Sequence, residues 1–257
     1  MNLHGKYIAF KTILIKEFLR FTRIWIQTVL PPAITMSLYF IIFGNLIGSQ
    51  IGNVHGFTYM EYIVPGLIML GIIANSYANV VSSFFGAKFQ RHIEEMLVSP
   101  TPNYVILLGF ISGGVMRGLI VGCVVFLVSL IFTHLQIHNL FVTVSVVFLT
   151  SMLFSLAGFI NGVFARSFDD ISIVPTFVLT PLTYLGGIFY SIDMLSPFWR
   201  RVSMVNPILY MINAFRYGIL GISDINVLVS FAIIIGSIVA LFMMGLYLLD
   251  RGVGIRT

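Results

Sequence analysis

Long apolar runs dominate the hydrophobic pattern of the chain. Windows of about 20 apolar residues predict membrane-spanning helices, because a helix rises about 1.5 Å per residue and the hydrocarbon core is about 30 Å thick. Six windows of this kind occur, at 25–48, 63–86, 113–133, 140–165, 171–190 and 226–249. The pattern predicts an all-α polytopic membrane protein in which residues 1–257 form one transmembrane domain, with an N-terminal helix (1–24), a six-span bundle (25–249) and a tail (250–257).

The residues before the first span have an amphipathic pattern. Tyr7, Phe10, Leu14, Phe18 and Phe21 recur at steps of three and four, and a separate stripe contains Lys16, Arg20 and Arg23. This pattern is typical of a helix that lies in the membrane interface with its basic residues toward anionic headgroups. We expect residues 1–24 to act either as an anchor or as an elbow that also touches a cytoplasmic partner.

A short polar segment, 88–102, joins the second and third spans. Phe89, Ile93, Met96 and Leu97 share one helical face, and Pro100 ends the helix because residues before proline disfavour the α region. The segment is predicted to be a short amphipathic helix outside the membrane. It is either a solvated connector or a docking surface, and an apolar face on a projecting helix favours docking.

Two further short helices are predicted between the fifth and sixth spans. Ser196-Pro197 and Asn206-Pro207 each place a capping residue before a proline, which starts a helix because proline lacks the N–H that a first turn leaves unpaired. The second helix is expected to end near Gly221. Its length of about 22 Å is too short to cross the hydrocarbon core, so both helices are expected to be re-entrant on the outer side.

Composition and charge support a membrane location and predict its sidedness. Hydrophobic residues make up 58% of the chain and charged residues 9%, with a mean hydropathy of +1.02. Ten basic residues fall in connections on one side of the predicted membrane, namely Lys6, Lys11, Lys16, Arg20, Arg23, Lys88, Arg91, Arg166, Arg251 and Arg256. Arg200, Arg201 and Arg216 fall on the other, and Arg117 lies near the start of the third span. The positive-inside rule places both termini in the cytoplasm, and no nucleic-acid partner is expected.

Polar and aromatic side chains inside two spans suggest a transport path. Asn75 and Asn79 share one stripe of the second span, which should face inward because polar groups are unfavourable in lipid. Phe177, Thr180 and Tyr184 follow matching steps in the fifth span, beside prolines that can kink it. Each residue is expected either to contact substrate or to pack helices together.

The segment 179–216 resembles a family motif. The last part of that motif is a proline, then an apolar residue, then any residue, then one of a small set of residues that includes tyrosine. Five further residues separate this last position from an arginine or a glutamine. Here Pro207-Ile208-Leu209-Tyr210 and Arg216 fill these positions, and Leu179, Leu182, Leu185, Gly186, Ile188, Leu195 and Ser196 fill the earlier ones. The chain therefore resembles the membrane-spanning subunits of ABC-2 type ATP-binding-cassette exporters, which include polysaccharide, drug and lipid permeases.

The resemblance implies a half-transporter in the bacterial inner membrane. Two copies of the chain, surrounded by membrane lipids, would pair as a homodimer with two ATP-binding-cassette ATPase subunits, which carry the ATP and Mg²⁺. The helix after the second span would be the coupling helix, which assigns ATPase docking to Glu94, Glu95, Met96, Leu97, Ser99 and Pro100. The second and fifth spans would line the path, and the outer motif would cap it through Ser196, Pro197, Asn206, Pro207, Tyr210 and Arg216. Arg216 would either anchor at lipid phosphates or form an ion pair with Asp193, Asp224 or Glu61.

The chain lacks the residues of a nucleotide-hydrolysing site. A phosphate-binding loop needs glycines followed by lysine and then serine or threonine. The sole candidate pair is Lys11-Thr12, and Phe10 stands where glycine is required. We therefore expect a transporter subunit that is not itself an enzyme and has no cofactor or metal of its own.

Two alternatives stay open. An ion-coupled secondary transporter usually needs carboxylates inside the membrane, whereas here no predicted span contains one and Glu17, Glu94 and Glu95 fall in cytoplasmic segments. A membrane-embedded enzyme would need a cluster such as His134 and His138, but no acidic residue is near them. No charged side chain is expected deep in the path, which favours a lipidic or amphipathic cargo.

Overall fold

The fold is an all-helical membrane bundle with a small hairpin. The structure is a computed structural model that describes residues 1–254, apart from the side chain of Asn45, so residues 255–257 of the predicted tail lie outside it. Five described helices are long and apolar enough to cross a membrane, namely Trp25–Ile51, Tyr59–Phe89 (α4), Asn103–Phe132 (α6), Leu140–Phe164 (α7) and Val227–Arg251 (α12). The first consists of α2 (Trp25–Tyr39), the π-helical η1 (Phe40–Ile47) and α3 (Gly48–Ile51). The predicted polytopic α-helical fold is therefore present.

The predicted fifth span is shorter than its apolar window. α8 (Asp170–Val174), η2 (Pro175–Leu179) and α9 (Thr180–Tyr184) form one continuous helix of 15 residues, because the residues at their joints have α-helical backbone angles. Such a helix reaches about 22 Å, less than the hydrocarbon thickness of about 30 Å. The chain then turns at Gly187, which adopts a left-handed φ of 75°. Five of the six predicted spans therefore correspond to helices long and apolar enough to cross a membrane, the fifth corresponds to a short helix, and the six-span arrangement stays a prediction.

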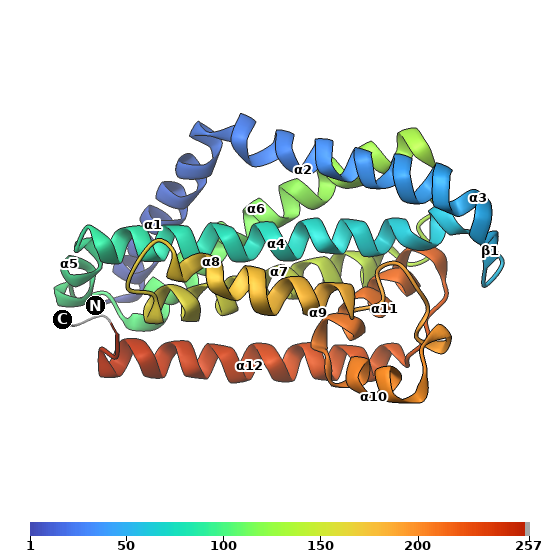
Figure 1. The fold of residues 1–257 in the computed structure, drawn as a ribbon. Coiled ribbons are helices and arrows are strands. Elements are labelled where there is room, and N and C mark those ends of the chain that lie inside the picture. Colours follow the sequence, from blue (N-terminus) through green and yellow to red (C-terminus); the bar gives the residue numbers. More distant parts are fainter. Residues whose placement is uncertain (255–257) are drawn as a thin grey trace.

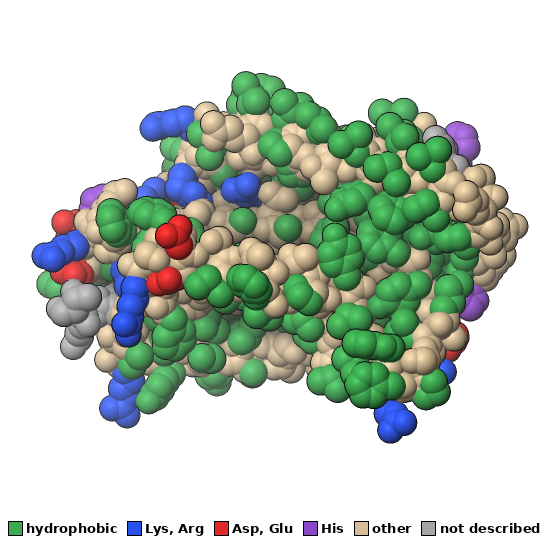
Figure 2. Space-filling view, viewed as in Figure 1, with side chains coloured by type: hydrophobic (Ala, Val, Ile, Leu, Met, Phe, Trp, Pro, Cys, Tyr) green, Lys and Arg blue, Asp and Glu red, His purple; other side chains and the backbone are tan. Residues whose placement is uncertain are grey.

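Both termini lie at the same end of the bundle (Figure 1). This terminal end also carries α5 (His92–Val98). The opposite cap end carries the hairpin of β1 (Asn53–Val54) and β2 (Phe57–Thr58), with η3 (Ile192–Met194), α10 (Pro197–Val205) and α11 (Pro207–Leu220). On the face of the molecule shown in Figure 2, charged side chains gather toward the terminal end. Hydrophobic side chains cover much of the middle of the same face. The location of the terminal end in the cytoplasm stays a prediction.

The two short helices predicted at the cap end begin at the expected prolines. α10 starts at Pro197 and α11 at Pro207, where the side chain of Asn206 accepts a hydrogen bond from the backbone N–H of Ile208 (3.0 Å). α11 stops before Gly221, whose left-handed φ of 77° ends the helix. The insertion of these helices into a membrane leaflet stays a prediction. The hairpin was not predicted, because two-residue strands are too short to show an alternating pattern.

α4 is the central helix of the bundle. It packs against α6, α7 and α11, and most of its side chains are buried. Glycines on the neighbouring helices permit this close approach, since a Cβ added to Gly118 would collide with Ser76 of α4 and one added to Gly158 would collide with the carbonyl of Tyr77. Small residues at helix contacts are typical of membrane proteins. α4 therefore links the two ends of the bundle as a firmly packed rod.

α1 (Leu3–Arg23) is the predicted amphipathic N-terminal helix. It crosses the bundle obliquely and meets α2 at a sharp corner (Figure 1). It packs mainly against α6 and buries Ile13, Glu17 and Phe21. The face of α1 that packs against the bundle therefore includes the carboxylate of Glu17. The sequence pattern had placed this residue in a cytoplasmic segment.

Candidate functional site

The predicted coupling helix is α5, at the terminal end. Arg91 adopts left-handed backbone angles (φ 61°) and turns the chain from α4 into α5. Ile93 is fully buried beneath the helix, whereas Glu94 and Glu95 are exposed in its first turn. Carboxylates are favourable there because the N-terminus of a helix carries a partial positive charge. α5 thus presents two carboxylates away from the bundle.

The apolar face of α5 differs from the prediction. Met96 and Leu97 are half-buried and pack against the core of the chain, whereas Phe89, which was expected on the same face, is exposed. The hydroxyl of Ser99 donates a hydrogen bond to the carbonyl of Met96 (2.6 Å) where the helix ends. The chain itself therefore covers most of this apolar face, so a partner would meet the two carboxylates and the exposed Val98.

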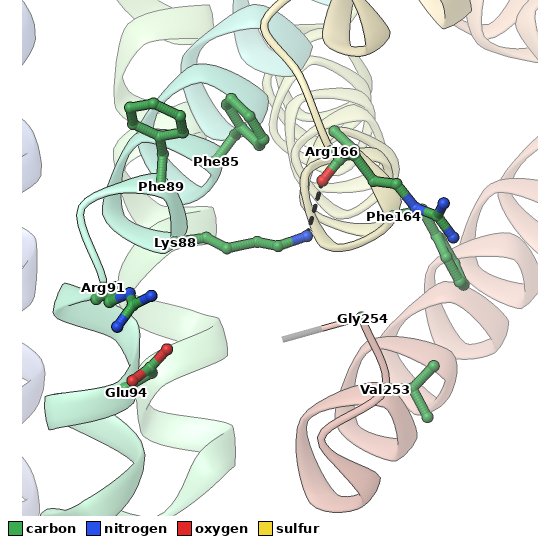
Figure 3. A pocket seen from close by; sticks show the side chains of 10 residues that line it. Phe85, Lys88, Phe89, Arg91, Glu94, Phe164, Arg166, Val253 and Gly254 are labelled. Carbon is green, nitrogen blue, oxygen red and sulfur yellow. Dashed lines mark hydrogen bonds between the residues drawn. The ribbon is translucent and has the colours of Figure 1, made fainter. Parts of the chain in front are cut away.

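A cavity of about 730 Å³ opens beside α5 (Figure 3). Lys88, Arg91 and Glu94 line it from the corner of α4 and α5, and Arg166 lines it from the segment after α7. Lys88 reaches across to the end of α7, where its Nζ donates hydrogen bonds to two backbone carbonyls (2.6 and 2.7 Å). The corner that carries α5 is thereby tied to α7.

The predicted path residues of α4 are buried and face α1 and α6. The side-chain oxygen of Asn79 accepts a hydrogen bond from Arg20 (2.7 Å), and that of Asn75 accepts one from Arg117 (3.2 Å). The amide nitrogen of Asn75 donates to the carbonyl of Gly71 on its own helix (3.0 Å). Both side chains therefore point inward, and each is already bound to an arginine.

The predicted path residues of the fifth helix lie on a different face. Phe177, Thr180 and Tyr184 are all exposed. Thr180 lines a cavity of about 250 Å³ between α4 and the fifth helix, where α4 contributes Ala74 and Tyr77. The two asparagines do not line this cavity. The structure therefore does not bring the two predicted sets together, because α4 turns mainly apolar residues, and not its asparagines, toward the fifth helix.

A buried charged network joins α1 to α4 and was not predicted. Glu17 is fully buried, accepts a hydrogen bond from Ser83 (2.6 Å) and lies 3.3 Å from Nε of Arg20. Arg20 also donates to the carbonyl of Asn79 (2.9 Å). Gly113 of α6 makes room for this network, since an added Cβ would lie 2.7 Å from Cβ of Glu17. The three-residue spacing of Glu17 and Arg20 is a sequence signal that could have indicated the ion pair.

Arg117 is a second positive charge beside this network. It lies in the middle of α6, because that helix begins at Asn103, ten residues before the predicted window. Arg117 thereby places a positive charge against Asn75, one of the predicted path residues. The expectation that no charged side chain lies deep in the path stays a prediction.

Arg216 is buried in the cap end, with 1% of its surface exposed. Its Nη2 donates a hydrogen bond to the carbonyl of Gly187 (2.7 Å), and its guanidinium carbon lies 4.0 Å from the ring centroid of Tyr62. It forms no ion pair with any of the three carboxylates considered from sequence, all of which lie in the described part of the chain. Neither predicted role matches this position, and Arg216 instead connects α11, α4 and the turn after α9.

The other residues of the outer motif hold α10 and α11 in place. The side-chain nitrogen of Asn206 donates a hydrogen bond to the carbonyl of Leu182 (2.5 Å), and the hydroxyl of Tyr210 donates one to the carbonyl of Met204 (2.7 Å). Ser196 precedes the first turn of α10. These contacts tie both cap helices to the end of the fifth helix.

Three polar side chains at the cap end place atoms that can bind a metal ion close to one another. His55, Asp193 and Asp224 each offer one such atom, and these atoms lie within 4.8 Å of one another. Asp193 is paired with Arg200 (3.0 Å), and Asp224 accepts a hydrogen bond from Ser191 (3.0 Å). Because both carboxylates already have partners, this group is explained as a polar link between the hairpin and the cap helices.

Comparison with known proteins agrees with this architecture. The family described as ABC-2 type transporter matches residues 8–220. The chain is 59% identical over 256 residues to "Inner membrane transport permease YadH" of Escherichia coli (strain K12), which covers 99% of this chain and 100% of that protein. It is also similar to two proteins named "Nodulation protein J". One, from Neorhizobium galegae, is 22% identical (80% of this chain, 79% of that protein), and one from Rhizobium leguminosarum bv. viciae is 23% identical (83% of each).

The matched region begins in α1 and ends with α11, so it includes both α5 and the cap helices described above. The high identity to an inner-membrane permease extends over practically the whole chain. Together with the five described helices that are long and apolar enough to cross a membrane, these matches support a multi-pass transport permease. The chain belongs to the ABC-2 type transporter family.

Proposed function

We propose that the chain is the permease subunit of an ATP-binding-cassette exporter. Two copies pair with each other and with two ATPase subunits, which bind and hydrolyse ATP with Mg²⁺. The assembly moves an amphipathic or lipidic substrate across the bacterial cytoplasmic membrane, and both termini of the chain lie in the cytoplasm. The observation that carries this proposal is α5, which presents two exposed carboxylates and continues directly from the most buried helix of the bundle.

The packing around α5 supports a role in coupling. Ile93 anchors the helix from below, and Lys88 ties the adjoining corner to α7. A displacement of α5 by a docked subunit would therefore move α4 and α7 together, because protein interiors are closely packed and resist local deformation. α4 reaches the cap end, so the motion has a direct mechanical route across the bundle.

The exposed faces of the first span and the fifth helix support a paired assembly. In Trp25–Ile51, 17% of the apolar window is buried within this chain, the same share as in α12, so both helices need cover from lipid or from a second copy. Phe177 and Tyr184 are exposed on the fifth helix. In the proposed homodimer, a second copy covers part of these surfaces and lipid covers the rest, and the substrate passes where the two copies meet.

The coupling role is tested by reversing the charge of α5. In membranes that contain the chain and its ATPase, Glu94→Arg combined with Glu95→Arg should lower copurification of the ATPase and substrate-stimulated ATP hydrolysis by about tenfold, since charge complementarity at an interface is replaced by repulsion. The amount of folded permease should not change, because both side chains are exposed.

Asp169→Arg is the matched control for this experiment. Asp169 is also an exposed carboxylate at the terminal end, but it lies in the segment between α7 and α8. The control should retain ATPase copurification and ATP hydrolysis. Unchanged ATPase binding by the α5 double variant, or equal loss in the control, would contradict the proposed docking site.

A further inference from the structure

A second cavity, of about 370 Å³, lies between α2, α4 and α6. Gln27 and Met36 line it from α2, Leu70 and Asn75 from α4, and Arg117 from α6. Figure 2 shows the surface hollowed between the corner of α1 and α2 and the rod of α4, with Lys or Arg side chains beside the hollow. Its size is within the range of small-molecule sites, which begins at about 300 Å³.

Arg117 brings a positive charge without a carboxylate partner to this cavity. Its Nη2 donates a weak hydrogen bond to Asn75 (3.2 Å), and its buried Nε has no partner among the described residues. No carboxylate of residues 1–254 lies within 4.0 Å of it, whereas the neighbouring Arg20 is paired with Glu17. A charge held inside a membrane protein is unfavourable unless an anion or other polar group neutralises it.

The charged and amide side chains of the cavity lie at one end of it, and the other end is mainly apolar, with the hydroxyl residues Thr35 and Tyr39 beside Met36. α2 runs from the terminal end toward the cap end and α4 runs back, so Gln27 and Asn75 lie nearer the terminal end, while Met36 and Leu70 lie nearer the cap end. Arg117 contacts Asn75 and therefore belongs to the polar part. A molecule that matches this order has an anionic head toward the terminal end and an apolar part beyond it.

The depth of the polar part corresponds to the edge of a leaflet. Gln27 lies in the first turn of α2, next to the exposed Trp25 and Arg23, and aromatic and basic side chains mark the level of lipid headgroups. A lipid headgroup at this level could reach Arg117 without first crossing the hydrocarbon core.

We propose that this cavity binds the anionic headgroup, a phosphate or carboxylate, of an amphiphile from the leaflet at the corner of α1 and α2. The guanidinium of Arg117 binds the headgroup, and the apolar part extends along Met36 and Leu70. Arginine suits this role because its planar donors bind phosphate and carboxylate oxygens in pairs. Binding requires neither ATP nor an ATPase subunit, so it goes beyond the proposed function and is measured separately from it.

The test is lipid binding to the purified full-length chain in a neutral detergent, measured by native mass spectrometry. Phosphatidylglycerol should bind more tightly than phosphatidylcholine with the same acyl chains. Arg117→Gln should weaken phosphatidylglycerol binding about tenfold and leave phosphatidylcholine binding unchanged, whereas Arg117→Lys should retain part of the preference. Arg23→Gln is the matched control, since it removes one positive charge at the headgroup level but outside the cavity, and it should weaken phosphatidylglycerol binding much less than Arg117→Gln does.

A variant that keeps every charge separates ligand binding from a structural role of Arg117. Ala74 lines the cavity, so Ala74→Phe should narrow it and weaken phosphatidylglycerol binding while Arg117 is intact, even if Arg117→Gln fails to fold. Unaltered phosphatidylglycerol binding by a folded Arg117→Gln chain or by Ala74→Phe would overturn the proposal. Inorganic phosphate that binds as tightly as the lipid would overturn the assignment to an amphiphile.

Discussion

Replacing Gly158 with leucine is expected to prevent the bundle from packing. Gly158 lies in α7 where that helix crosses α4, and an added Cβ would stand 2.5 Å from the carbonyl oxygen of Tyr77 and 3.3 Å from its Cα. The obstacle is backbone, which cannot rotate away as the end of a side chain can. Overpacking typically costs 1 to 3 kcal/mol, and a collision with backbone at this crossing should cost about 3 kcal/mol or more.

Gly236→Leu is the matched control for this prediction. Gly236 lies in the membrane helix α12, and a Cβ there would meet nothing within 4 Å. The control should fold normally and gain up to about 1 kcal/mol of helix propensity. The measurement is the yield of monodisperse protein in detergent and its thermal unfolding midpoint. A Gly158→Leu chain that unfolds at the same temperature as the control would show that α4 and α7 do not pack as described.

The apolar windows predicted the membrane helices well, because hydrocarbon imposes a minimum length that any sequence must satisfy. The same argument was wrong about length for the fifth window. Its apolar residues continue beyond Tyr184, but the helix stops there and Gly187 turns the chain into the cap end. A hydropathy window records composition and does not detect where a helix ends, so the turn was hidden within an apolar run.

At the cap end, residues that start helices predicted the structure more reliably than hydropathy windows did. Pro197 and Pro207 begin helices as predicted, since proline at a first turn is a local rule that does not depend on tertiary contacts. The hairpin at residues 53–58 carries only a weak sequence signal and was missed. The predicted site residues of α5 lie at the terminal end and those of the outer motif at the cap end, and their roles in coupling and capping stay predictions.

The side-chain partners of buried polar residues could not be predicted from one helix at a time. Asn75 and Asn79 were expected to face inward, and both are buried. Their partners are arginines on α1 and α6, which the pattern of α4 alone does not identify. Glu17 is buried because Gly113 on a helix far along the chain leaves space for it. Such pairs depend on contacts between distant segments, which helical periodicity does not record.

Arg216→Ala is expected to destabilise the cap end by about 3 kcal/mol, comparable to the loss of a large buried aromatic side chain. Arg216 is the largest of the fully buried side chains, so alanine would leave a large cavity between α11 and α4. The substitution also removes the donor to the carbonyl of Gly187 and the cation over the ring of Tyr62. The unfolding midpoint and the rate of proteolytic cleavage between α9 and α10 should both report the change.

Arg216→Met separates the volume of this side chain from its charge. Methionine fills most of the space but cannot donate to Gly187, a loss of about 1 to 3 kcal/mol. Against this loss stands the relief of a buried guanidinium whose Nε and Nη1 have no partner among the described residues. The two effects nearly cancel, so the methionine variant should remain within about 1.5 kcal/mol of the unaltered chain. If methionine is as destabilising as alanine, the hydrogen bond to Gly187 rather than the packing of Arg216 holds the cap helices on α4.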